Sequence, residues 1–431
     1  MSESLINWDD FLQVASLSDV GMRRSNNQDN LCVSMASSLE HWSRKGHLFV
    51  VADGMGAHAA GELASKLAID HIPHLYAKYN DDLPPLAMRK AVQDANAAIH
   101  QRGQANEEFH NMGTTCSVLN ILPQGAVIAH IGDSRVYRYS QNKIEQLTFD
   151  HSLVWEMKAA GQLTDEEEKQ GKVPKNVITR SLGPYAECKV DLEGPFPVQA
   201  GDTFLLCSDG LTAVIEDSEI GSILSNMPPK EAAKVMVDLA NLRGGPDNIT
   251  VVIVKIAHPQ LATSQAGAVS IDQSKNASAA APAWIWIALA VSTLLAILLF
   301  CLVSKWLAIA PAVAALVFVI LGIIKSFGGK GNVPRMSSKP FGKGPYMQMA
   351  CSSGEQFSGQ LAKMIGKIKK GAQEQDWAID WAALEKLIKN AEAATAKKDH
   401  SGAIRLYGRA VSFLMDQLRN QNVNDLSLIH I

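Results

Sequence analysis

Cysteine is scarce in this chain of 431 residues, and its six cysteines lie far apart. No two of them form a Cys-x-x-Cys pair, so neither a disulfide framework nor a zinc site is indicated. Thiols in such a pattern are typical of a reducing, cytosolic compartment. The cysteines are Cys32, Cys116, Cys188, Cys207, Cys301 and Cys351.

A positive charge excess and a secretory signal are also missing. The formal net charge is -3, which argues against bulk electrostatic attraction to nucleic acid. The first residues, MSESLINWDDF, have neither a basic start nor an apolar core, so no signal peptide is predicted. We therefore expect no nucleic-acid partner.

Residues 12–256 combine short apolar runs with helical patterns and are expected to fold as one globular domain. The strand candidates, rich in β-branched and aromatic residues, are 47–52, 115–122, 126–131, 135–140, 203–208 and 248–256. Apolar residues three and four apart predict helices over 60–79, 84–103 and 229–243. Because the strands cluster and two long helices are adjacent, the order favours an α+β layered fold over a doubly wound one.

The middle of the chain is expected to meet a membrane. Residues 257–282 are rich in Ala and Ser and lack periodicity, which predicts a flexible linker. Residues 283–325 hold two long apolar runs almost end to end, separated by Ser304 and Lys305. A buried core hairpin is the alternative, but runs of this length favour two transmembrane helices. Basic residues follow the second run, so the positive-inside rule puts both long ends in the cytoplasm, at a bacterial inner membrane.

The C-terminal part opens with a basic, Gly-rich stretch, 326–373, which is expected to be a loop region that can touch anionic headgroups. The amphipathic pattern of residues 374–420 predicts a helical hairpin. Within it KDHSGAIRLYGRAV resembles half of a tetratricopeptide repeat, so a plain hairpin and a repeat both stay open. Such a tail is a candidate for binding proteins. The last residues, 426–431, look like a translated sequencing adapter and are expected to be non-native.

Three apolar strand candidates end at a carboxylate: Asp53 in HLFVVADG, Asp133 in VIAHIGDS and Asp209 in FLLCSDG. One Asp-Gly alone is most simply a hairpin turn. Asp247 stands before a strand instead, and in an antiparallel sheet the end of one strand and the start of its neighbour share an edge. Four carboxylates on one rim would raise one another's pKa unless a cation neutralised them. All-oxygen ligands suit Mg²⁺ or Mn²⁺, so the pattern predicts a divalent-cation site.

The motifs around these residues are SDVGMRRSNNQDN, VADGMGAHAAGELAS, MGTTCSVL, AHIGDSRVYRY, QLTFDHSLV, ITRSLG, LLCSDGL and GGPDNITVVIV, over residues 17–256. In this order they resemble the metal-dependent serine/threonine protein phosphatase family (type 2C, PPM), of the bacterial sort. Each motif is weakly specific alone, and together they are highly specific. The resemblance implies a central antiparallel β-sandwich flanked by helices, in four layers α-β-β-α, with a metal centre at one end.

The resemblance also implies a set of metal ligands, which in chain order are Asp29, Asp53, Gly54, Asp133, Asp209 and Asp247. Asp53 would bridge two cations, Mn²⁺ or Mg²⁺, and Gly54 would offer its carbonyl to one of them. Asp209 and Asp247 would complete the ligand shell of the second cation. Asp133, together with Asp209, would hold a third ion. Asp29 would lie beside the centre and act through a bound water.

Arg24 resembles the phosphate clamp of the family, because a planar guanidinium can bind two phosphate oxygens at once; an ordinary surface role is the alternative. Neighbouring Arg23 is expected to be a surface charge. The implied reaction is hydrolysis of phosphoserine or phosphothreonine by a hydroxide held between the metal ions, without a covalent intermediate. The absence of a covalent intermediate is consistent with the cysteines, because none of them lies in a phosphate-binding Cys-x5-Arg loop.

Three residues depart from the family pattern. Gln28 replaces a carboxylate in NQD, which is expected to weaken one metal site modestly. Met55 stands where eukaryotic relatives have a histidine proposed as the general acid, and methionine cannot donate a proton. His58 is the nearest candidate donor and is taken as a catalytic residue, although a structural role is equally open. Ala57 replaces a usual glycine, which would matter if that position needed a positive φ.

Residues 152–183 match a mobile flap beside the site in bacterial relatives. Two functions of different class follow. The first is a membrane-tethered phosphoprotein phosphatase that opposes a serine/threonine kinase partner. The second is a catalytically weak scaffold that binds phosphoproteins. Every metal-binding aspartate of the family pattern is present, which favours the enzyme.

Overall fold

The computed structural model describes residues 7–57, 59–80, 82–174, 176–263, 340–351, 354–374 and 377–419, with two short segments, 270–271 and 336–337, and isolated positions between 291 and 297. The chain divides into two compact units. One comprises 1–268 together with 340–431, and the other comprises 269–339. The larger unit contains the predicted catalytic domain and the C-terminal helices.

The first sheet of the larger unit has six antiparallel strands in the order β1-β11-β10-β7-β8-β14. They are β1 (Leu12–Asp19), β7 (Arg135–Ser140), β8 (Lys143–Gln146), β10 (Thr203–Cys207), β11 (Ile249–Ile256) and β14 (Met347–Ala350). β11 pairs with β1 on one side and β10 on the other, and only Lys255 among its residues is not buried. A nearly continuous apolar run, broken here only by Thr250 and Lys255, is typical of a strand covered on both faces.

The second sheet has the order β2-β3-β5-β6-β9, with the short strand β4 (Gly113–Thr114) beside β3. Its strands are β2 (Asp29–Ser34), β3 (His47–Met55), β5 (Cys116–Leu122), β6 (Gly125–Ile131) and β9 (Asp191–Phe196). Successive side chains of β3 face opposite sides of the sheet. Phe49 and Val51 join the core between the two sheets, whereas Val50 and Ala52 pack under the helices outside.

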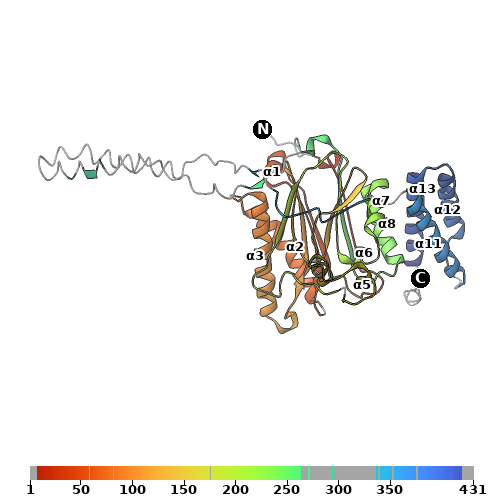
Figure 1. Ribbon diagram of the computed structural model, residues 1–431, viewed down its shortest axis with the longest axis horizontal. Helices are drawn as coiled ribbons and strands as arrows, with labels where there is room; N and C mark the ends of the chain where they lie inside the picture. The colour runs from red at the N-terminus through yellow and green to blue at the C-terminus, as the bar shows by residue number, and fades with distance from the viewer. Residues whose placement is uncertain are drawn as a thin grey trace. The chain divides into compact units, whose positions relative to one another are not determined.

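Helices cover the outer face of each sheet (Figure 1). α2 (Ala60–Lys78) and α3 (Pro84–Gln104) lie on the second sheet, and α7 (Asp217–Asn226) and α8 (Pro229–Leu242) lie on the first. The shorter helices are α1 (Leu39–Lys45), α4 (Leu153–Ala159), α5 (Asp165–Lys169) and α6 (Asp209–Thr212). The predicted α+β sandwich flanked by helices is confirmed, and the compact fold runs past residue 256 to Thr263, whose amide N–H donates to the Val198 carbonyl.

The C-terminal part differs from its prediction. Residues 354–373, expected to belong to a loop region, form nearly all of helix α11 (Gly354–Glu374). Its buried residues recur at helical spacing, from Phe357 through Leu361 and Ile365, so an apolar stripe was present among the lysines and glycines. The predicted hairpin is present as α12 (Trp381–Ala396) and α13 (His400–Arg419).

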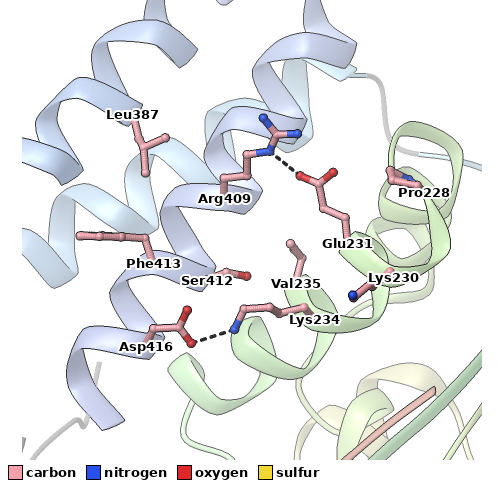
Figure 2. Close-up of a pocket in the computed structure, with 10 residues that line it drawn as sticks. All are labelled: Pro228, Lys230, Glu231, Lys234, Val235, Leu387, Arg409, Ser412, Phe413 and Asp416. Carbon is pink, nitrogen blue, oxygen red and sulfur yellow. Dashed lines mark hydrogen bonds and ion pairs between the residues drawn. The ribbon is translucent and has the colours of Figure 1, made fainter. Parts of the chain in front are cut away.

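These three helices form a further layer on α7 and α8 (Figure 1). Their buried side chains belong to the same hydrophobic cluster as the outer face of the first sheet. Gly408 of α13 permits the close approach, because a Cβ there would lie 2.5 Å from Met227 Cε and 3.2 Å from Val235 Cγ2. A groove of about 540 Å³ remains between α8, α12 and α13, flanked by the ion pairs Arg409–Glu231 and Lys234–Asp416 (Figure 2).

The segment before these helices crosses the open edges of both sheets. The N–H of Phe341 donates to the carbonyl of Gly194 in β9, and β14 pairs with β8. Between these two points the buried carboxylate of Glu193 accepts the N–H of Gly344 at 2.9 Å and the hydroxyl of Tyr346. Residues 340–351 are therefore part of the sandwich rather than a free loop.

The predicted transmembrane helices, 283–325, lie outside the described residues except for a few isolated positions. Among the residues that the structure describes, no helix has both the length and the apolar character needed to cross a bilayer. Most of the predicted linker, 257–282, and the final residues 426–431 likewise lie outside the description.

Candidate active site

One end of the sandwich gathers the predicted site residues around a cleft of about 220 Å³. The residues lining this cleft include Arg24, Asp53, Gly54, Asp133, Asp209 and Asp247. We refer to it as the catalytic cleft. The strand pattern alone predicts that these carboxylates meet, and the structure places them together. His58, the candidate proton donor, lies outside the described residues.

The strand ends explain this convergence. Asp53 lies near the end of β3, where it is paired in register with Asp29 at the start of β2. Asp209 comes two residues after the end of β10 and begins α6, and Asp247 precedes the neighbouring strand β11. Asp133 occupies the turn between β6 and β7. Each sheet therefore contributes carboxylates to the same end of the sandwich.

Asp29 is buried beneath the cleft. Its Oδ2 accepts a hydrogen bond from the hydroxyl of Ser208 at 2.7 Å. The Ser208 hydroxyl oxygen in turn accepts the backbone N–H of Thr250 at 2.9 Å. Asp29 is thus fixed between the two sheets, in keeping with a place beside the metal centre rather than at the cleft surface.

The carboxyl groups are held in an environment that disfavours their charged forms. Desolvation, with smaller contributions from Asp209 and Asp247, raises the pKa of Asp29 to about 7. Desolvation and then Asp209 raise the pKa of Asp133 to about 8. The pKa of Asp53 is raised well above its ordinary value by desolvation and by its acidic neighbours, and desolvation also raises that of Asp209. This is the electrostatic setting that a bound cation would relieve.

Unsatisfied oxygen atoms provide a test of whether these residues fit a metal. Asp29 Oδ1, Asp133 Oδ1 and Asp209 Oδ1 are buried without a hydrogen-bond partner. Buried polar atoms normally have a partner, and hard cations such as Mn²⁺ or Mg²⁺ take oxygen ligands of this kind. In the described part of the chain, no three His, Cys, Asp or Glu side chains are already arranged as a metal site. The chemistry of the donor set fits divalent cations, and their assignment to single residues is a proposal.

Arg24 lies at the mouth of the catalytic cleft with about half of its side chain exposed. Its Nη2 donates to Asp247 Oδ2 at 2.7 Å. The loop that carries Arg24 is held by Asn248, a residue that the sequence argument did not single out. The side-chain amide of Asn248 donates to the carbonyls of Val20 and Asn26, and its Oδ1 accepts the N–H of Gln28.

The last part of β3 packs closely at Gly54, where a Cβ would lie 2.1 Å from the carbonyl oxygen of Gly61. Gln28, the predicted departure, also lines the cleft, and its side-chain amide donates to the carbonyl of Gly56 at 3.3 Å. Met55 lines the same cleft and has no proton to offer. Ala57 is not among the residues of positive φ, so the alanine there is unstrained.

A second cleft, of about 230 Å³, adjoins the first and shares Asp133 and Asp209 with it. Its wall contains Arg135, whose guanidinium pairs with Asp150 at 2.7 Å and lies 5.6 Å from the ring of Trp155. Trp155 belongs to α4, within the predicted flap. Arg135 and Asp150 lie in motifs of the family resemblance, but no role was predicted for them, because spacing alone does not show that they adjoin Asp133.

The predicted flap, 152–183, is bound to the edge of the site. Ser152 forms a β-bridge with Ile178, and Leu182 forms one with Thr114. Asn176 lines both clefts and Ile178 lines the catalytic cleft. The flap therefore forms part of the wall of both clefts.

Comparison with known proteins agrees with this architecture. A family model described as "Protein phosphatase 2C" matches residues 23–234. The protein phosphatase PhpP of Streptococcus pneumoniae is 39% identical over 251 residues, which are 57% of this chain and 98% of that protein. The structure of the Mycobacterium tuberculosis serine/threonine phosphatase PstP/Ppp is similar, with a TM-score of 0.50 and 33% identity, and covers 57% of this chain and 100% of its own.

A second structure, of the PstP catalytic domain in complex with two manganese ions, is 33% identical with a TM-score of 0.48, covering 57% of this chain and 99% of its own. The chain belongs to the protein phosphatase 2C family. It is a serine/threonine protein phosphatase of this type, and the predicted class of enzyme, a phosphoprotein phosphatase, is confirmed.

Proposed function

We propose that the catalytic cleft binds two divalent cations, Mn²⁺ or Mg²⁺, through Asp53, the Gly54 carbonyl, Asp209 and Asp247, with Asp29 beside them through water. Asp133 and Asp209 would hold a third ion. When bound, the cations supply Lewis acidity and neutralise negative charge. The observation that carries this proposal is the meeting of buried carboxylates with unpaired oxygens in one cleft.

Arg24 is proposed to orient the phosphate. Its side chain lines the cleft and is about half exposed, and one of its amino groups pairs with Asp247. A phosphomonoester entering beside it would gain paired N–H···O hydrogen bonds and a fixed orientation for in-line attack by water. Met55 cannot protonate the leaving oxygen, so His58 stays the candidate donor in this proposal.

The test is phosphate release from a phosphothreonine peptide by the full chain, with Mn²⁺ and with excess EDTA. Asp209→Asn should lower turnover by about three orders of magnitude or more, because it removes charge at the position shared by the proposed ions. Asp416→Asn, at an exposed carboxylate on α13, is the matched control and should keep wild-type turnover. Full activity in EDTA, or in Asp209→Asn, would remove the metal proposal. Absence of activity in the wild type with Mn²⁺ would favour the phosphoprotein-binding scaffold instead.

The proposal also includes a tether at the bacterial inner membrane, with the catalytic domain and the C-terminal helices in the cytoplasm. Val291, Leu294 and Ile297, within the first predicted span, are large apolar side chains that are more than half exposed in the structure. Residues before 268 and after 340 belong to one compact unit. Any membrane segment between them must therefore cross an even number of times, which suits two spans and is incompatible with one.

A membrane location would concentrate the enzyme near membrane-bound serine/threonine kinases and their phosphoprotein substrates, which it would oppose. Membrane fractionation of the full chain, with protease-accessibility tags at residue 2 and after residue 419, tests this proposal. Both tags should lie on the cytoplasmic side of sedimented membranes. Tags on opposite sides, or a chain that stays in the supernatant, would contradict it.

A further inference from the structure

The last described residue of α13 reaches the base of the loop that carries Arg24. Arg419 Nη2 donates to Asp19 Oδ2 at 2.7 Å, although 400 positions separate the two residues in sequence. Asp19 ends β1, and its side chain is only 18% exposed, whereas that of Arg419 is 40% exposed. The pair joins the C-terminal helical layer to the catalytic sheet at a partly buried position, where charges are less screened by solvent.

The other oxygen of Asp19 organises the start of that loop. Asp19 Oδ1 accepts the backbone N–H of Gly21 at 2.9 Å and the side-chain amide of Asn241 at 3.0 Å. Asn241 lies in α8, the helix that α13 covers. One carboxylate thus receives donors from the loop, from the helical layer on the sheet and from the layer beyond it.

After Asp19, close packing and hydrogen bonds fix the backbone of the loop. Gly21 has a φ of +81°, and a Cβ there would lie 2.1 Å from the Asp247 carbonyl oxygen, so the position requires glycine. The N–H of Met22 donates to the Gly245 carbonyl at 2.9 Å. Two residues later Arg24 pairs with the side chain of Asp247. A change in the direction of the Asp19 carboxylate would therefore act on the turn that places Arg24.

We propose that Arg419 is a positioning residue for phosphate binding, acting through Asp19 on the turn at Gly21. The inference rests on the proposed role of Arg24 as the phosphate-binding residue. Arg419 holds the Asp19 carboxylate in the orientation that directs Oδ1 at the Gly21 N–H. Without it, Oδ1 keeps its donors but Oδ2 loses its charged partner, and the carboxylate gains freedom to turn toward solvent.

Asp238 is the other acidic group near Arg419, with its Oδ1 3.7 Å from Arg419 Nη2. Lys234 lies 3.0 Å from the other oxygen of Asp238, so this carboxylate has a cation of its own. Arg419 is therefore the cation that pairs with Asp19, whereas Asp238 is paired with Lys234. Through this contact the C-terminal helices contribute to substrate binding without touching the substrate.

The experiment compares Arg419→Gln with Arg409→Gln in the full chain. Both arginines lie on α13, and each pairs with a carboxylate of the catalytic part, but Arg409 pairs with Glu231 and has no contact with Asp19. KM and kcat are measured on a phosphothreonine peptide, inhibition is measured with inorganic phosphate, and the midpoint of thermal unfolding is recorded. Arg419→Gln should raise KM and the phosphate inhibition constant about three- to tenfold, with kcat within about twofold.

Arg409→Gln should leave both constants at wild-type values, and Arg419→Lys should recover part of the loss because it restores the charge. In a cycle with Asp19→Asn, the effects of Arg419→Gln and Asp19→Asn on KM should be less than additive. Wild-type KM in Arg419→Gln, or an equal rise in Arg409→Gln, would overturn the inference. Failure of the proposed function is distinguishable, because it is shown by wild-type KM and phosphate inhibition in Arg24→Ala, a variant that leaves Asp19 and Arg419 in place.

Discussion

The two helical layers of the sandwich differ in what covers their outer faces. α2 buries one stripe, with Ala60, Ala64, Ala68, Ile72 and Tyr76 at successive intervals of four residues. This is the pattern of a helix with a sheet on one side and solvent on the other. α8 instead has buried residues all around its axis, including the unbroken run from Val235 to Leu242.

The difference shows that α8 is an interior helix. It lies between the first sheet and the C-terminal helices, so side chains on both of its faces are buried, the polar Asp238 and Asn241 among them. The helices that cover it lie beyond the segment that matches the family, residues 23–234. We conclude that residues 340–419 complete the hydrophobic core of the phosphatase, whereas α2 and α3 complete their side of it without help.

Removal of residues 340–431 should have the largest effect on stability. The cut should expose apolar side chains such as Met227 and Val235, each costing about 1.5–3 kcal/mol when fully exposed. We expect the midpoint of thermal unfolding to fall by about 10 °C or more, with reduced solubility. Calorimetry of the truncated and full chains checks this. Equal midpoints would make the C-terminal layer an appended domain.

Acidification should destabilise the sandwich through the buried His47. His47 of β3 is fully buried, and burial, assisted by His41, lowers its pKa to about 4. The unfolded chain, with a histidine pKa near 6.5, therefore binds this proton more readily. The stability that His47 contributes is complete above pH 6.5 and is lost as the pH falls from 6.5 to 4, by up to about 3 kcal/mol. Urea unfolding of wild type and His47→Gln across this range should show a shallower loss in the variant; parallel losses would exclude His47.

The contact between α13 and α8 can be tested with two glycines. Gly408→Leu places a side chain against Met227 and Val235 and should destabilise the fold by about 1–3 kcal/mol. Gly366→Ala, on α11 where nothing lies within 4 Å of an added Cβ, should instead stabilise by up to about 1 kcal/mol. Denaturant unfolding of both variants measures the difference. Similar effects at the two positions would show that α13 is not closely packed on α8.

The ion pairs between α13 and α8 should contribute least to the stability of the fold. Arg409 is 57% exposed where it meets Glu231, so solvent screens the pair. A double-mutant cycle with Arg409→Gln and Glu231→Gln should give a coupling free energy below about 1 kcal/mol. A much larger coupling would mean that charge, and not apolar burial, holds the two layers together.

The sequence predicts the sandwich and the cleft because their signals are local. Each predicted strand is a short β-branched run, and Asp53 and Asp209 mark the points where such runs reach solvent. The order of the strands in the sheets then brings the carboxylates together. Arg24 was found through the family resemblance, and its anchor at Asn248 was missed because a side chain that ties loops together has no periodic signature.

The C-terminal layer was predicted less well, for a different physical reason. The stripe of Phe357, Leu361 and Ile365 indicates a helix, but the lysines and glycines around it led to the expectation of a loop. An amphipathic face also does not identify the surface that will cover it. The need for a covering layer becomes evident only in the structure, where α8 is buried from Val235 to Leu242 with the polar Asp238 and Asn241 included.

After residue 340 the chain returns to the sandwich, and non-covalent contacts hold the C-terminal part there. β14 is hydrogen-bonded to β8, and α13 shares a hydrophobic cluster with α8, so the C-terminal part is held by contacts that do not depend on the peptide link through 264–339. A single proteolytic cut in that stretch would leave two polypeptides joined as one enzyme. When the two pieces are expressed separately, they should reassemble through the β8 edge and the outer face of α8.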